Sequence, residues 1–431
     1  MSRTLALGGA VLALGALGAG GALAQGGFDP VAATDAYLAS VPAADKARSD
    51  AYFEGGYWLI LWGLLADVAV AWVLLATGTA ARLHQRALRL TRGRLWPAAF
   101  LQGIGVVLAT TVLTLPLVVY EDFFREHQYG LSNQGFGEWL LDQLKVLPVS
   151  LLATGFTVAM IYLFIRRVGW SWWAWGGGFV VLFQIFAIMV APVFIAPLLN
   201  DYKPLRQGEL REAVLSMARA NGVPADDVYE FDASRQSDRI SANVSGFLGT
   251  TRISLNDNLL NRTSPQETLA VMGHEVGHYV LNHSVRLLLQ FGLVIMAGFL
   301  FVDRLFPRVL ARFGQGWGVR GIDDPAGLPL LTALVSVYFF LATPVTNSII
   351  RSVEAEADMF GLNAAREPDA FATVALKLGQ YRKLDPAPWE EVIFFDHPSG
   401  RSRILMSMRW KAEQPGVGEP ALQVGEAAHG R

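Results

Sequence analysis

Six apolar stretches limit what this chain can fold into more than any other feature of its sequence. They cover roughly residues 57–77, 97–119, 146–165, 173–199, 285–306 and 328–350. A helix needs about 20 apolar residues to cross a bilayer, and in lipid it satisfies its own backbone hydrogen bonds. The composition agrees, with 52% hydrophobic and only 17% charged residues. We therefore expect a mainly α, polytopic bundle of six to seven transmembrane helices in a lipid bilayer.

The N-terminal 24 residues decide between six and seven spans. Arg3 is followed by a Leu/Ala/Gly run that ends in Ala22-Leu23-Ala24, an A-x-A cleavage pattern. This predicts a cleaved signal peptide, and the alternative is an uncleaved first span. In either case the polar segment 25–56 lies on the trans side of the membrane.

Arginines alternate between the loops that join the spans. Three loops carry Arg82, Arg86, Arg89, Arg92 and Arg94; Arg166 and Arg167; and Arg304, Arg308, Arg312 and Arg320. The positive-inside rule places these loops in the cytoplasm. Residues 121–145, 200–284 and 351–413 then share the opposite face. We expect a multi-pass protein of the bacterial inner membrane with these segments in the periplasm.

The second strong feature is His274-Glu275-x-x-His278, in an apolar stretch over residues 268–281. On a helix the two imidazoles lie on one face and can hold one metal ion, while Glu275 lies beside the open coordination position. Ser264 is a suitable N-cap, and Glu267 can complete a capping box. The pattern predicts a catalytic metal site on a helix.

A mononuclear catalytic zinc needs three protein ligands, and the chain has no cysteine to supply one. The segment 351–358, RSVEAEAD, offers carboxylates. Glu354 and Asp358 share a helix face, whereas Glu356 points elsewhere. We assign Glu354 as the third ligand of one Zn²⁺ per chain, and Asp358 as the acceptor that orients a liganding imidazole. The alternative is an acidic helix start in solvent.

The remaining soluble parts predict a small α+β zinc-metalloprotease lobe over residues 200–284, completed by 351–413. Its expected elements are a helix at 209–221 and strands at 228–232, 243–248 and 252–255. The pair of spans within 285–350 separates its two parts, and residues 414–431 read as a disordered tail. Asn243 and Gly246 would lie on an edge strand that can bind an extended peptide substrate. The alternative is a simple hairpin.

The motifs HEVGHYVLNH at 274–283 and RSVEAEAD at 351–358 resemble the type I CAAX prenyl protease family of integral membrane zinc metalloendopeptidases. Further matching segments are FFREHQYGLSNQ (123–134), FIAPLLNDYKPL (194–205), SANVSGFLGTTRISLND (241–257) and DHPSGRSRI (396–404). The resemblance implies zinc ligands at His274, His278 and Glu354, a catalytic base at Glu275, and a bundle of about seven helices around a chamber. Eukaryotic members place the site in the cytosol, whereas this chain's charge pattern favours the trans face.

The expected reaction is peptide hydrolysis of peptide or protein substrates. Zinc lowers the pKa of its water to about 7, and Glu275 takes the proton. The resemblance supports His397 as the donor that stabilises the oxyanion, although a histidine before a proline is often structural. Arg403 is a candidate for substrate binding, with a surface arginine as the alternative.

Two other functional classes compete with a protease. A membrane chaperone or scaffold with a structural zinc would have no use for the base Glu275. A transporter is suggested by the number of spans and by Asp67 inside the first, but the spans carry few other charges. Nucleic acid is excluded as a partner, because the formal net charge is -2 and no basic patch is present.

Overall fold

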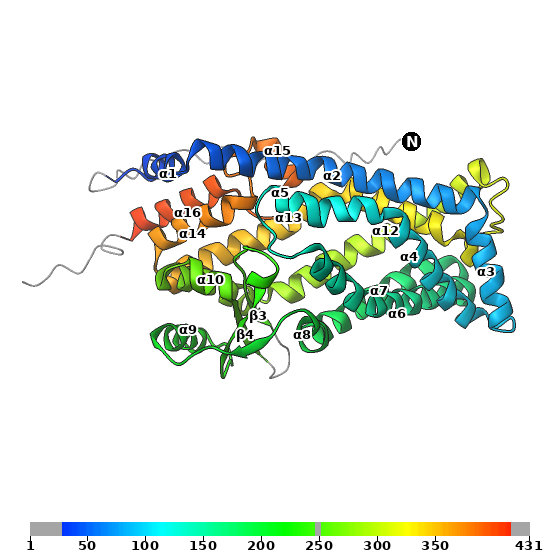
Figure 1. The fold of residues 1–431 in the computed structure, drawn as a ribbon, viewed down its shortest axis with the longest axis horizontal. Coiled ribbons are helices and arrows are strands. Elements are labelled where there is room, and N and C mark those ends of the chain that lie inside the picture. Colours follow the sequence, from blue (N-terminus) through cyan, green and yellow to red (C-terminus); the bar gives the residue numbers. More distant parts are fainter. Residues whose placement is uncertain (1–27, 246–250, 415–431) are drawn as a thin grey trace, which may run out of the picture.

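The structure, a computed structural model, describes residues 28–245 and 251–414. Five of the six apolar stretches each lie in one long helix, whereas the stretch 173–199 fills a long helix as far as Val190 and then continues through a π-helical turn (Ala191–Ile195) and the short α8 (Ala196–Leu199) (Figure 1). These helices are α2 (Ala43–Ala76), α4 (Leu95–Val119), α6 (Phe136–Val168), α7 (Trp172–Val190), α12 (His283–Phe313) and α13 (Leu328–Ala365). In the described part of the chain, 5 continuous segments are long and apolar enough to cross a membrane, and one of them, Phe136–Val190, contains both α6 and α7. The mainly α membrane fold is confirmed.

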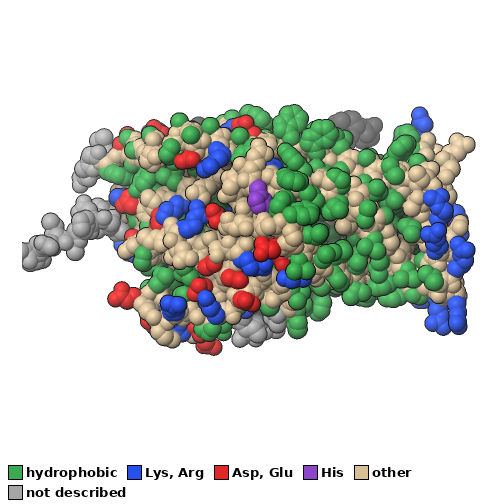
Figure 2. All heavy atoms as spheres, viewed as in Figure 1, with side chains coloured by type: hydrophobic (Ala, Val, Ile, Leu, Met, Phe, Trp, Pro, Cys, Tyr) green, Lys and Arg blue, Asp and Glu red, His purple; other side chains and the backbone are tan. Residues whose placement is uncertain are grey.

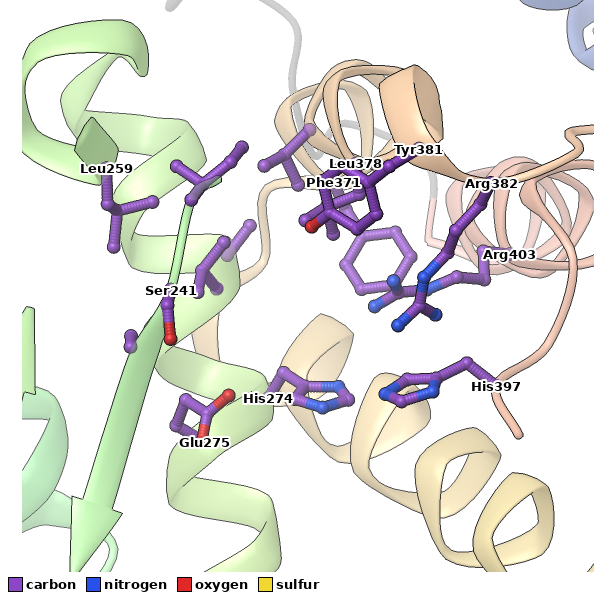
Figure 3. Close-up of a pocket in the computed structure, with 15 residues that line it drawn as sticks. Ser241, Leu259, His274, Glu275, Phe371, Leu378, Tyr381, Arg382, His397 and Arg403 are labelled. Atoms are coloured by element: carbon purple, nitrogen blue, oxygen red, sulfur yellow. The ribbon is translucent and has the colours of Figure 1, made fainter. Parts of the chain in front are cut away.

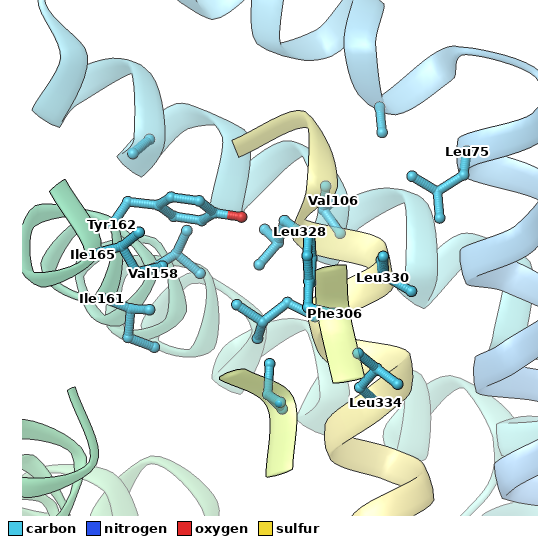
Figure 4. Close-up of a cluster of buried hydrophobic side chains, with 14 of the residues drawn as sticks. Leu75, Val106, Val158, Ile161, Tyr162, Ile165, Phe306, Leu328, Leu330 and Leu334 are labelled. Carbon is cyan, nitrogen blue, oxygen red and sulfur yellow. The ribbon is translucent and has the colours of Figure 1, made fainter. Parts of the chain in front are cut away.

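A core of buried apolar side chains holds the membrane helices together towards the end where α3 (Thr79–Leu90) lies (Figures 1 and 4). Its largest fully buried members include Leu75, Tyr162 and Phe306. Small residues let α4 and α6 approach closely, as in many membrane proteins. A Cβ on Gly103 would lie 3.1 Å from the Cα of Gly155.

Two helices extend well past the apolar stretches that they contain. α2 begins at Ala43, inside the polar segment 25–56. α13 continues from the last apolar stretch through to Ala365, so the final span and the segment 351–358 form one helix. Pro344 lies inside α13 without ending it, which neighbouring structure permits in membrane helices. The polar segment 121–145 is also largely helical: a π-helical turn (Tyr120–Arg125) and α5 (Glu126–Gln128) precede α6.

The soluble lobe contains a four-stranded sheet in the order β1-β2-β4-β3. Its strands are β1 (Tyr202–Pro204), β2 (Val228–Phe231), β3 (Ala242–Ser245) and β4 (Arg252–Asn256), and only the β2–β4 pair is parallel. β3 is an edge strand, and β1 is an element that the sequence did not indicate. One face of the sheet packs on α11 (Pro265–Val280), where Val228, Ile253 and Leu255 join one apolar cluster with Met272 and Val276.

The remaining helices complete the lobe around α11. They are α8 (Ala196–Leu199), α9 (Glu209–Ala220), α10 (Asp257–Arg262), α14 (Pro368–Leu378), α15 (Pro388–Phe394) and α16 (Gly400–Glu413). The first described helix, α1 (Pro30–Ala39), packs against α16, and Arg401 joins the two through Asp35. The predicted signal peptide, Gly246 and residues 415–431 of the predicted tail lie outside the described residues.

Candidate metal centre

The helix that carries the histidine pair begins with a complete capping box. The Ser264 hydroxyl accepts a hydrogen bond from the Glu267 amide at 3.2 Å, and the Ser264 amide donates to the Glu267 carboxylate at 2.7 Å. Pro265 occupies the first helical position, where a missing N–H costs nothing. Lys377 of α14 also donates to the Glu267 carboxylate, at 2.6 Å. The start of α11 is therefore fixed both within the helix and by the neighbouring helix.

Three side chains converge between α11 and α13. The Nε2 atoms of His274 and His278 lie 3.0 Å apart. The Glu354 carboxylate places Oε2 at 3.2 Å from the first and Oε1 at 3.5 Å from the second. One ligand atom from each residue fits within a span of 4.8 Å. Two imidazoles and one carboxylate are a donor set that suits zinc.

A buried oxygen in this cluster supports the fit to a cation. Glu354 Oε2 is buried and forms no hydrogen bond. Nε2 of His274 and Nε2 of His397 each lie 3.2 Å from it but complete no hydrogen bond. A buried carboxylate oxygen without a hydrogen bond is costly, and a bound ion would remove that cost. The three residues therefore fit a resident metal ion.

Two glycines set the distance between the helices that carry these ligands. A Cβ on Gly273 would lie 2.9 Å from the carbonyl oxygen of Gly361, and a Cβ on Gly361 would lie 2.8 Å from the His274 amide nitrogen. Real Cβ atoms essentially never approach so closely. α11 and α13 can therefore pack closely enough to bring the histidines to Glu354 only with glycine at both positions. The sequence motifs gave no indication of this requirement.

Asp358 holds the first imidazole in place. Its Oδ1 lies 2.8 Å from His274 Nδ1, and Arg403 of α16 donates to both of its oxygens. Burial alone would lower the pKa of His274, but the hydrogen bond with Asp358 and the nearby carboxylate of Glu354 outweigh it and raise that pKa to about 10. Arg403 is itself buried, so it is not the surface arginine of the alternative interpretation.

The second imidazole has a partner that sequence reasoning did not assign to the site. His283 is buried, and its Nδ1 lies 2.9 Å from Nδ1 of His278. Glu356 lies outside the three-residue cluster, as its helix position predicts: it binds Arg286 at 2.7 Å, and its Oε2 is 3.4 Å from Nε2 of His283. The signals for His283 in the sequence were its position five residues after His278 and its place at the end of the matching motif HEVGHYVLNH.

A pocket of about 240 Å³ opens beside the cluster. Glu275 and His397 line it together with His274, and burial raises the pKa of Glu275. His397 points towards His274 from the opposite wall (Figure 3), with its Nε2 at 3.2 Å from Glu354 Oε2 and its Nδ1 at 2.8 Å from Asp396. Tyr381 and Arg382 also line the pocket, and no motif in the sequence pointed to them.

The candidate substrate residues divide between two places. Arg403 reaches the wall of this pocket while its guanidinium binds Asp358. Asn243 lies on the edge strand β3, but its side chain lines a different pocket. Ile240 and Ser241, which directly precede β3, line the pocket beside Glu275.

Comparison with known proteins places this geometry in a family. The profile of peptidase family M48 matches residues 204–408, and that of the CAAX prenyl protease N-terminal region, described as five membrane helices, matches residues 35–201. The uncharacterized metalloprotease YhfN of Bacillus subtilis is 31% identical over 374 residues, which are 84% of this chain and 85% of that protein. The chain belongs to peptidase family M48. It is an integral membrane metalloprotease, and a non-catalytic scaffold is not favoured.

Other relatives of this M48 protein carry the name CAAX prenyl protease. A CAAX prenyl protease 1 homolog of Oryza sativa is 27% identical and covers 68% of this chain and 69% of its own length. CAAX prenyl protease 1 of Saccharomyces cerevisiae is 33% identical, over 42% of this chain and 40% of its own. The crystal structure of S. mikatae Ste24p matches the fold with a TM-score of 0.72 at 21% identity, covering 85% of this chain and 89% of that one. The family implies a bound metal and peptide or protein substrates.

Proposed function

We propose that this M48 protein is a zinc metalloendopeptidase in which His274, His278 and Glu354 bind the metal and Glu275 is the general base. The observation that carries the proposal is the convergence of the three side chains around an oxygen of Glu354 that has no hydrogen bond. A zinc ion held there would supply a Lewis acid that makes water acidic, with a pKa of about 7, and polarises the scissile carbonyl.

Residues of the chain accept the proton of the attacking water and fix the protons of the liganding imidazoles. Glu275 follows His274 directly and lines the pocket, so it can accept a proton from the attacking water. The same carboxyl group can then deliver that proton to the leaving amine. Asp358 fixes the proton of His274 on Nδ1, which leaves Nε2 free to bind the metal. His283 can accept from Nδ1 of His278 in the same way.

His397 is proposed to stabilise the oxyanion. Its Nδ1 faces Asp396, and its Nε2 points into the cluster near Glu354. When the ring carries both protons, Nε2 can donate to a developing negative charge while Asp396 balances the ring's charge. Such a donor contributes to kcat and leaves metal binding unchanged.

The substrates that we propose are membrane-associated peptides or proteins, and the site faces the periplasm of a bacterial inner membrane. The support is the distribution of charge. At the end of the molecule where α3 lies, beyond a wide apolar band, the charged side chains are Lys and Arg, whereas the opposite end, which contains the soluble lobe, carries Asp and Glu together with Lys and Arg (Figures 1 and 2). Basic residues remain in the cytoplasm by the positive-inside rule.

Glu275→Gln tests the proposed base. The variant should keep its metal, because Glu275 is not a ligand, and lose peptide cleavage by about a hundred- to ten-thousand-fold. Elemental analysis and peptide hydrolysis on the same purified sample separate the two effects. Glu356→Gln, whose carboxylate faces Arg286, serves as the control and should retain activity. Substantial turnover by metal-replete Glu275→Gln protein would remove Glu275 from the mechanism.

A further inference from the structure

The sheet of the soluble lobe has two faces of opposite character. Side chains alternate along a strand, so the register assigns each residue to a face. Val228, Ile253 and Leu255 face α11. The opposite face therefore carries the residues that alternate with them and their cross-strand neighbours: Tyr202, Pro204, Tyr229, Phe231, Asn243, Ser245, Arg252, Ser254 and Asn256. Nothing in the proposed protease mechanism uses this second face.

Arg252 stands at the centre of the second face without an anionic partner. Its guanidinium carbon lies 4.1 Å from the ring centroid of Tyr202 and 4.3 Å from that of Tyr229. Its Nε and Nη2 atoms are buried and form no hydrogen bond. Over residues 28–245 and 251–414, no Asp or Glu forms a salt bridge with it. The two aromatic rings orient the guanidinium, but its donors lack acceptors, which native structures rarely leave unexplained.

A pocket of about 340 Å³ adjoins this arginine. Asn243, Ser245 and Ser254 line it from the sheet, and Ala191, Pro192, Ile195 and Ala196 line it from the other side. That second wall is the direct continuation of the membrane helix α7. The pocket thus combines one cation with hydroxyl and amide groups, which is the chemistry that binds a phosphate.

The surroundings of the pocket identify where such a phosphate would come from. Ile188 is 61% exposed and Phe194 is 67% exposed, at the end of α7 and on the wall segment itself. Figure 1 shows α8, which follows this segment, beside the lower end of the sheet. Exposed apolar side chains at the end of a membrane helix contact lipid, so the mouth of the pocket lies at the level of the lipid headgroups.

We propose that this pocket binds the phosphate headgroup of an anionic phospholipid, with Arg252 as its charge partner. The acyl chains would lie along the apolar end of α7. Cationic pockets at the ends of membrane helices hold lipid headgroups by the same combination of charge and apolar contact. Binding there would fix the lobe against the membrane at the edge strand β3.

Two variants and one control test this proposal in purified protein. Arg252→Gln removes the charge. Ser245→Glu supplies a carboxylate directly across from Arg252, because the register pairs these two residues. Arg219→Gln, on the exposed surface of α9, makes the same change of net charge away from the pocket. The readout is the rise in apparent melting temperature when vesicles of phosphatidylglycerol are added, compared with phosphatidylcholine vesicles and with inorganic phosphate alone.

Wild-type protein and Arg219→Gln should be stabilised by phosphatidylglycerol more than by phosphatidylcholine. Arg252→Gln and Ser245→Glu should bind phosphatidylglycerol at least about fivefold more weakly, since one arginine near an anionic membrane surface is worth about 1 kcal/mol. An undiminished lipid response in both variants would overturn the proposal.

An equal response to inorganic phosphate would make the ligand a free anion. A raised KM for peptide in lipid-free detergent would make the pocket part of the substrate site. Lipid binding does not require catalysis, so these outcomes are independent of the role of Glu275.

Discussion

Asp358 is the most constrained carboxylate among the residues around the metal centre. It is fully buried, and it balances His274 on one side and Arg403 on the other. A buried ion pair adds little net stability, but removal of one partner leaves a buried charge that is strongly destabilising. Arg403 therefore acts on the proposed metal ligand His274 through Asp358. Its loss should lower both the free energy of unfolding and the activity.

Substitution of Arg403 measures how much the ion pair with Asp358 contributes to stability. Arg403→Gln should lower the free energy of unfolding by about 3 to 5 kcal/mol, because Asp358 then lacks its cation. Arg401→Gln, two residues before Arg403 on α16, should cost no more than about 1 kcal/mol, because its ion pairs with Asp35 and Asp385 are partly exposed. Denaturant titrations in detergent give both values. Equal destabilisation by the two variants would contradict this account.

Removal of the proposed third ligand tests the metal set. Glu354→Gln should purify with far less zinc than the wild type, because a neutral amide oxygen is a poor substitute for the carboxylate. Glu356→Gln is the matched control, two residues along the same helix and paired with Arg286 instead. Elemental analysis of the purified proteins is the measurement. Stoichiometric zinc in Glu354→Gln would exclude Glu354 as a ligand.

Residue spacing indicated the histidine pair and the Glu354–Asp358 face because both lie on single helices, where spacing determines direction. It could not indicate that Arg403 reaches Asp358, since that contact depends on how α16 packs over α13. The contact between His278 and His283 depends on the sharp change of direction at Asn282, which has a φ of 53°. Contacts between elements are decided by packing, and a single sequence carries little information about packing.

At the scale of elements, the capping box at Ser264 and the close contact between Gly273 and Gly361 fix the position of α11 relative to α13. Helix starts were predictable where side chains mark them locally, as at Ser264 and Pro265. The strands β2, β3 and β4 were also predictable from short apolar runs between turns. The continuity of α13 was not, because the change from apolar to charged residues at 351 resembles the end of a span. A helix can leave the bilayer without any break in its hydrogen bonds.

The capping box gives α11 a stability that depends on pH. Burial acts to raise the pKa of Glu267, but hydrogen bonds from Lys377 and the Ser264 amide outweigh it and hold this pKa below its usual value. A carboxyl group whose pKa is lower in the folded state stabilises the fold above its unfolded pKa, and this contribution disappears as the pH falls. Glu267→Gln should therefore cost about 1 kcal/mol at about pH 7 and less at about pH 4.

Apparent melting temperatures of Glu267→Gln and wild type at the two pH values provide the measurement. Glu209→Gln, at the exposed first turn of α9, is the control and should show no such convergence. A difference between Glu267→Gln and wild type that stays constant with pH would mean that the side chain contributes through packing and not through its charge.

At the scale of the whole molecule, the proposed orientation has a direct test. Alkaline phosphatase is active only after export, so a fusion after Asp257 in the lobe should be active. A fusion after Gln315, between α12 and α13, should be silent if the proposed orientation is right, because the positive-inside rule assigns this connection, with four arginines in or beside it, to the cytoplasm. The opposite pattern of activity would place the metal centre in the cytoplasm.

Because α13 continues without a break from its apolar stretch to Glu354, it fixes the height of the proposed metal site above the membrane. Its apolar stretch ends at about residue 350, and Glu354 follows one helical turn later, which is a rise of about 6 Å. An extended chain covers that height in about two residues. A substrate that remains anchored in the membrane can therefore present only the peptide bonds next to its anchor. The choice of bond would then follow from depth in the membrane as much as from the side chains around the cut.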